Sequence, residues 1–121
     1  MVLRELINKV QLYSGFSDAE SREALELMVE SLAERLDEND RKTFASQLPR
    51  ELKEIALSVY PIPENSDQDL LRQFMEIQEV EESRAKRQIN ASWRALKDVI
   101  NGKIINRIQA QMPSTALIFL H

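Results

Sequence analysis

Gln47-Leu48-Pro49-Arg50-Glu51-Leu52 occurs near the middle of the chain. A related segment, Gln111-Met112-Pro113-Ser114-Thr115-Ala116, follows 64 residues later, and the apolar residues of the chain are arranged in the same order before each segment. The apolar positions ahead of the two segments match at the same offset, in the pairs Leu6/Leu70, Ile7/Leu71, Val10/Phe74, Leu25/Ile89, Val29/Trp93, Leu32/Leu96, Leu36/Ile100 and Phe44/Ile108. Few of these residues are identical, so the repeat is one of register. A repeated apolar pattern predicts a repeated structural unit. We therefore predict two related units, residues 1–60 and 67–121, joined by a proline-containing linker over residues 60–66.

The spacing of apolar residues within each unit is that of amphipathic helices. Leu3, Leu6, Ile7 and Val10 follow the i, i+3, i+4, i+7 pattern of one helix face. Ser17-Asp18-Ala19-Glu20 has the form of a capping box, which begins a second helix. The chain contains only 2 Gly and 4 Pro, fewer than the tight turns of an all-β protein need. The sequence predicts an all-α fold in which two pseudo-repeated helical units pack into one helical bundle domain over residues 1–121.

About four helices are expected in each unit. Asn39 is predicted to cap the third helix, and Pro49 is predicted to lie in the first turn of the fourth. In the second unit, Ser66 is predicted to begin the first helix. The apolar face of that helix is predicted to contain Leu70, Leu71, Phe74, Ile77 and Val80. No helix-breaking residue follows it, so this helix and the next are expected to fuse, or to bend slightly near residues 81–83.

Composition and charge limit the possible functions and locations. The chain has no cysteine, which excludes disulfides, zinc–thiolate sites and thiol catalysis. The net charge of −4 predicts no general attraction to nucleic acid or to anionic lipid. The N-terminus has an early acidic residue and no long apolar core, unlike a signal peptide, and no apolar run approaches the ~20 residues that span a bilayer. A cytoplasmic protein without a membrane span is expected.

Catalytic and metal-binding residues are not apparent. The only histidine is His121, at the C-terminus, and no glycine-rich turn offers an oxyanion hole or a phosphate-binding loop. The best acidic cluster is Asp37-Glu38-Asn39-Asp40, but it lacks the glycine and the spacing of a calcium loop. Acidic residues at a helix start are ordinarily favoured by the helix dipole. We predict that the protein is not an enzyme and has no catalytic residue, no metal site and no cofactor.

The Gln47-Leu48-Pro49-Arg50-Glu51-Leu52 segment, with the leucine-rich helix and the charged turn ahead of it, resembles a bacterial family known as domain of unknown function 2267. Members of that family share a Q-L-P-x-x-L segment, and the similarity covers most of the chain. The second copy departs from this segment, because Ala116 stands where a leucine is expected. The resemblance implies no catalytic residue, since the function of the family is unknown.

Basic residues are concentrated between positions 83 and 107, where Asp98 is the single acidic residue. Trp93 lies among them, and basic residues beside an aromatic ring are typical of nucleic-acid contact. However, Trp93 corresponds to Val29 in the repeat, which predicts that its ring is in the core. A solvated face is the favoured interpretation, with an acidic protein partner or a nucleic acid as the alternatives. The residues that would carry such contacts are Arg84, Arg87, Arg94 and Lys97.

The last helix, expected to run to His121, is apolar on both sides. Lys53 and Glu54 of the first unit correspond to Leu117 and Ile118. Such a helix is central in the fold, forms an interface with a partner or a second subunit, or results from truncation of the chain. We expect Leu117 and Ile118 to be covered by a second subunit, in a homodimer through residues 114–120. The candidate interface residues are Leu117, Ile118, Phe119 and Leu120.

The function that best fits these features is a non-enzymatic helical protein-interaction or assembly module, which binds a protein partner or itself. One alternative is a small regulatory nucleic-acid-binding protein that uses the basic residues of segment 84–107. Another is a helical domain that binds an apolar ligand between its two units. Oligomeric state, salt-dependent binding to DNA or RNA, and a co-purified small molecule would distinguish the three.

Overall fold

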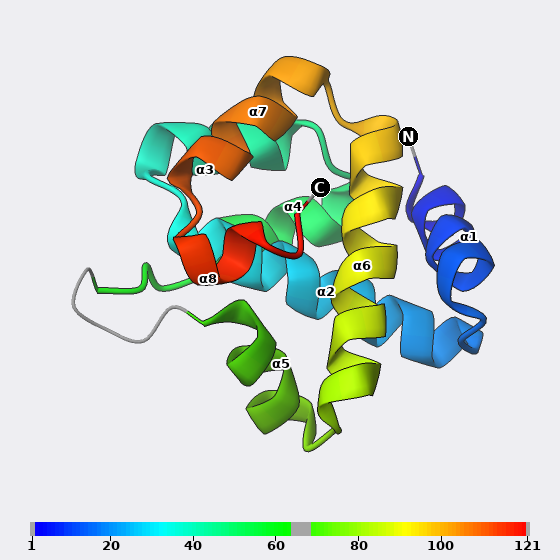
Figure 1. Cartoon of the computed structure of the whole chain (residues 1–121). Helices are drawn as coiled ribbons and strands as arrows, with labels where there is room; N and C mark the ends of the chain where they lie inside the picture. The colour runs from blue at the N-terminus through cyan, green and yellow to red at the C-terminus, as the bar shows by residue number, and fades with distance from the viewer. Residues whose placement is uncertain (1, 64–68, 121) are drawn as a thin grey trace.

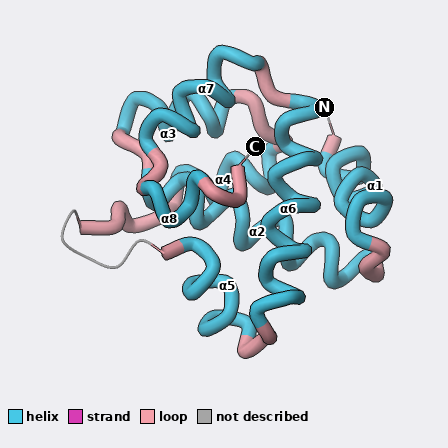
Figure 2. Tube along the Cα trace, in the orientation of Figure 1, coloured by secondary structure: helices cyan, strands magenta, loops and turns pink. Residues whose placement is uncertain are grey.

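The computed structural model describes residues 2–63 and 69–120, and all regular secondary structure in these ranges is helical (Figures 1 and 2). The helices are α1 (Leu3–Ser14), α2 (Asp18–Arg35), α3 (Glu38–Ser46), α4 (Arg50–Leu57), α5 (Leu70–Gln78), α6 (Glu82–Val99), α7 (Gly102–Gln111) and α8 (Ser114–Leu117). The prediction of an all-α fold is confirmed. The predicted helix start at Ser66 and the end of the predicted linker lie outside the described residues.

Helices α6, α7 and α8 of the second half begin at the 64-residue offset seen in the sequence, whereas α5 begins 67 residues after α1. Helices α2 and α6 are both 18 residues long and begin at Asp18 and Glu82. Helices α3 and α7 begin at Glu38 and Gly102. Leu32 in α2 and Leu96 in α6 are both fully buried. The starts of three helix pairs therefore match the register of the proposed repeat, while α1 and α5 differ in length and offset, and the structural repeat stays a prediction.

The core is built around α2 and α6, which cross near the centre of the molecule (Figure 1). Helix α1 packs against both of them, α4 against α2, α5 against α6, and α3 against α7. The largest fully buried side chains come from both halves of the chain and include Leu6, Leu25, Phe44, Leu52, Phe74, Ile89 and Leu96. Trp93 is 2% exposed, so its predicted place in the core is confirmed. One continuous hydrophobic core thus joins the two predicted units.

Several predicted helix starts are confirmed, and one is shifted. The Ser17 hydroxyl accepts a hydrogen bond from the Glu20 backbone N–H at 3.1 Å, and the Glu20 carboxylate accepts one from the Ser17 N–H at 2.9 Å, which completes the capping box. Pro49 and Pro113 immediately precede α4 and α8. The predicted cap at Asn39 is wrong, because Asp37 accepts from the Asp40 N–H at 2.8 Å and the helix begins earlier.

Helices α5 and α6 do not fuse, contrary to the sequence-based expectation. Glu79 adopts a left-handed conformation with φ 53°, and the chain turns there without a glycine. This conformation costs a residue with a side chain about 1–2 kcal/mol. The turn lets α5 fold back against α6, so that Leu70 and Phe74 are fully buried. It also leaves Ile77 60% exposed, so the expectation that Ile77 belongs to the buried face is wrong.

The glutamines of the two repeated segments each reach across to the other half of the chain. The side-chain carbonyl of Gln47 accepts from the backbone N–H of Asn101 at 3.4 Å, and that of Gln111 accepts from the N–H of Asp37 at 2.8 Å. Asn101 and Asp37 are the residues that cap α7 and α3. Each glutamine therefore holds the start of the third helix of the opposite half.

The buried carboxylate of Asp40 adds further hydrogen bonds to the contact that Gln111 makes with the first half of the chain. The Asp40 side chain is 6% exposed and accepts hydrogen bonds from Arg107, at 2.6 Å to Nε, and from the amide of Gln111. The pKa of Arg107 is raised, mainly by its hydrogen bond to Asp40. The Asp37–Asp40 cluster, considered above for metal binding, is thus used for helix capping and for contact between the halves.

Candidate binding groove

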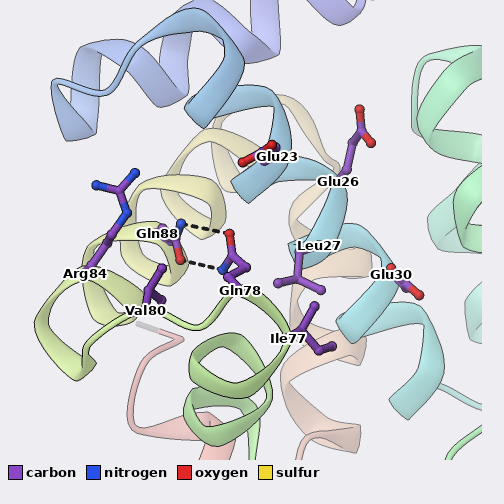
Figure 3. A pocket seen from close by; sticks show the side chains of 9 residues that line it. All are labelled: Glu23, Glu26, Leu27, Glu30, Ile77, Gln78, Val80, Arg84 and Gln88. Carbon is purple, nitrogen blue, oxygen red and sulfur yellow. Dashed lines mark hydrogen bonds between the residues drawn. The ribbon is translucent and has the colours of Figure 1, made fainter.

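An open groove of about 480 Å³ lies between α2 and the turn that joins α5 to α6 (Figure 3). Its rim on α2 carries Glu23, Glu26 and Glu30, and its floor contains Leu27, Ile77 and Val80. We call this feature the acidic groove. Sequence analysis did not identify it, because its two walls are far apart along the chain and the α5–α6 turn that completes it was not predicted.

The rim of the acidic groove is a set of carboxylates on one helical face. Positions 23, 26 and 30 are separated by three and four residues, so the three residues lie on one face of α2. Glu23 and Glu30 are exposed and Glu26 is half-buried. No residue in the described ranges forms an ion pair with any of the three. The rim therefore presents three uncompensated negative charges to solvent.

The floor of the acidic groove is apolar and only partly covered. Leu27 is buried, Val80 is half-buried and Ile77 is 60% exposed. Full burial of an aliphatic side chain of this size is worth roughly 1.5–3 kcal/mol. A molecule that covers Ile77 would recover part of that free energy.

The back of the acidic groove is held by a pair of amides (Figure 3). Gln78 donates to the Gln88 carbonyl at 2.7 Å, and Gln88 donates in return to the Gln78 carbonyl at 3.0 Å. Gln88 is 2% exposed and Gln78 is half-buried, so this reciprocal pair is partly shielded from water. It fixes the end of α5 on α6 and keeps the walls of the groove in place before any ligand arrives.

Arg84 lies at one end of the groove, but its charge is already compensated. Its guanidinium forms an ion pair with Glu20 and lies 4.8 Å from the centre of the Phe16 ring. The pKa of Glu20 is lowered to about 2, first by the hydrogen bond from the Ser17 backbone and then by the hydrogen bond from Arg84. The charge of the groove is therefore set by its three glutamates.

The four candidates of the basic face all lie on α6, and three of them contact α1 or the turn after it. Arg84 contacts Phe16, as described. Arg87 donates to the Ser14 carbonyl at 2.8 Å and also lies 4.8 Å from the Phe16 ring centre. Arg94 stacks 4.0 Å from the ring centre of Tyr13, while Lys97 is half-buried. The structure thus gives these arginines a role in holding α1 against α6, which the sequence did not reveal.

The C-terminal candidates separate into two groups. Leu120 is 2% exposed and belongs to the core, and its carbonyl accepts from the Gln109 amide at 2.6 Å, so the prediction that Leu120 is an interface residue is wrong. Phe119 is half-buried against the same core. Helix α8 ends at Leu117, before the predicted end at His121, and the following turn directs Leu120 inward. Leu117 and Ile118 remain 38% and 63% exposed.

No metal-binding cluster is evident in the part of the chain that the structure describes. Within residues 2–63 and 69–120, no three His, Cys, Asp or Glu side chains lie together in a way that could hold a metal ion. None of the described helices combines the length and the hydropathy needed to cross a membrane.

The fold and the groove define an all-helical domain with a preformed acidic and apolar surface. The model of the family described as "Uncharacterized conserved protein (DUF2267)" matches residues 3–117. The chain belongs to this family, as the Gln47–Leu52 segment indicated. A search of curated proteins found no match.

Proposed function

We propose that the protein is a non-enzymatic helical interaction module, which binds a protein partner in the acidic groove. The observation that carries this proposal is the combination of an exposed apolar floor at Ile77 with a rim fixed in advance by α2 and by the Gln78–Gln88 pair. Ile77 is a single exposed aliphatic side chain, so the proposal depends on its position beside the three glutamates and not on the extent of the apolar surface. The absence of cysteine also supports a cytoplasmic location.

The shape of the acidic groove favours a polypeptide over a small ligand. Its rim extends over eight residues of α2, from Glu23 to Glu30, which corresponds to about 10 Å of helix. The groove is open to solvent, whereas small-molecule sites usually enclose most of their ligand. The nucleic-acid alternative has less support, because Arg84, Arg87 and Arg94 are engaged with α1 and the turn after it.

A charge on the groove floor is expected to abolish partner binding. Ile77→Lys would place a positive charge in the apolar contact, and burial of that charge without a partner should weaken binding by at least about tenfold. Leu12→Lys is the matched control, because Leu12 is 77% exposed and lies outside the groove. Proteins recovered with each form from the native host would be quantified. Recovery should persist with Leu12→Lys and fall with Ile77→Lys, and equal recovery with both would contradict the proposal.

A second candidate is self-association through Leu117 and Ile118, which the fold of a single chain leaves exposed. We expect the wild type to be a dimer at micromolar concentration, and Leu117→Lys with Ile118→Glu to give a folded monomer. Leu57→Lys is the matched control, since Leu57 is 49% exposed at the end of α4. Sedimentation and circular dichroism measure these outcomes. A monomeric wild type would remove the homodimer.

A further inference from the structure

We propose that the acidic groove binds a basic amphipathic helix of a partner protein. This inference rests on the proposed function and specifies the chemistry of the partner. Three features carry it: the unpaired carboxylates of the rim, the apolar floor between them and the α5–α6 turn, and the straight helical edge that α2 provides.

The negative charge of the rim determines which charge the partner surface carries. Glu23, Glu26 and Glu30 have no ion-pair partner among the described residues, and Arg84 at the end of the groove is already paired with Glu20. An acidic partner would therefore meet like charge along the whole rim. Lysine or arginine side chains would gain attraction there, and they can lay their aliphatic stems along the apolar floor.

The spacing of the rim determines the form of the partner. Carboxylates separated by three and four residues lie along one line of α2, and a helix placed beside α2 presents basic side chains at the same interval. An apolar residue between those basic positions would then face Ile77 and Val80 in the floor (Figure 3). This is the arrangement in which amphipathic helices bind hydrophobic grooves.

The next glutamate along α2 is not part of this rim. Glu34 is half-buried, and the amide of Gln73 donates to its carboxylate at 3.1 Å. The pKa of Glu34 is raised, mainly by burial. Glu34 does not line the groove, so the rim ends at Glu30, and we expect the bound segment to extend over about two helical turns of contact.

A designed peptide tests this inference directly. The probe is a fluorescent amphipathic helix of about 18 residues, with leucine on one face and flanking lysines. Its controls are a scrambled peptide of the same composition and a version with glutamate in place of lysine. Binding to the full chain would be measured by anisotropy at low and raised salt concentration, because screening weakens contacts between exposed charges.

Two triple variants test the rim, and each replaces three glutamates by glutamine, either in the groove or elsewhere on the surface. Glu23→Gln, Glu26→Gln and Glu30→Gln together should weaken binding of the lysine peptide by roughly tenfold, as expected for three partly exposed ion pairs. The matched control combines Glu38→Gln, Glu51→Gln and Glu54→Gln, all exposed residues on α3 and α4. This control changes the net charge equally and should leave binding within about twofold, as expected for screened remote charges.

Each outcome has a defined meaning. Equal weakening by both triple variants, or equal binding of the scrambled peptide, would show general attraction to an acidic protein and would overturn the inference. Partner recovery that depends on Ile77 without binding of the lysine peptide would also overturn it, while leaving the proposed function in place. Displacement of the peptide by self-association of the chain would identify a second copy as the occupant and would likewise overturn it.

Discussion

Truncation of Leu96 to alanine is expected to lower the free energy of unfolding by about 2–5 kcal/mol. Leu96 lies in α6 with no exposed surface, at the centre of the core that joins the two halves. The substitution removes buried methyl groups and leaves a cavity that the surrounding helices fill only in part. Chemical denaturation followed by circular dichroism would measure the loss.

Two further variants serve as a comparison in the first half of the chain and as a surface control. Leu32→Ala should cause a loss of similar size, because Leu32 occupies the corresponding position of α2 and is also fully buried. Leu12→Ala is the control, since Leu12 is 77% exposed, and it should change stability by no more than about 0.5 kcal/mol. If Leu96→Ala and Leu12→Ala proved equally mild, the central place of α6 in the core would be wrong.

Replacement of Gln111 by alanine is expected to cost about 2–3 kcal/mol, the second-largest effect. It removes the hydrogen bond from the Asp37 N–H and the bond that the amide donates to the Asp40 carboxylate. The second loss is the larger, because Asp40 is charged and its side chain is only 6% exposed. Denaturation of the variant and the wild type would measure the difference.

The corresponding glutamine of the first half provides a matched comparison. Gln47→Ala removes a single bond of 3.4 Å to the Asn101 N–H, so the expected loss is about 0.5–1 kcal/mol. Gln111→Ala combined with Asp40→Ala should cost less than the sum of the two single losses, because the residues are hydrogen-bonded to each other. Additive losses, or a larger effect of Gln47→Ala, would contradict the proposed contact between the halves.

Local signals in the sequence predicted local structure well. The capping box at Ser17 and the helix starts after Pro49 and Pro113 follow from short-range spacing and residue type. The burial of Trp93 was predicted from its match to Val29 in the register of the repeat. The prediction that helices α5 and α6 fuse, or bend slightly near residues 81–83, was wrong because the chain turns at a left-handed Glu79 in place of a glycine. A glutamate in that conformation has no signature in the sequence, since the packing of α5 on α6 stabilises it.

The candidate sites could not be predicted from single segments, because the burial of each side chain depends on which other helices pack against it. Leu117, Ile118, Phe119 and Leu120 form one apolar run, yet the turn after α8 buries Leu120 and leaves Ile118 exposed. Likewise, the acidic side chains of α2 border a groove only because α5 places Ile77 opposite them. Which side of an amphipathic segment is covered depends on the elements that reach it in space.

The amino-acid sequence alone therefore determined the helical class, the positions of most helices and the register of the proposed repeat, because helix periodicity and capping act over a few residues. The tertiary structure decided how residues far apart in the chain meet: the glutamines that cross between the halves, the arginines of α6 that hold α1, and the acidic groove. These features depend on packing between helices that are distant in sequence. Such contacts contribute to stability only after the core has formed, because only then do the distant helices lie close together.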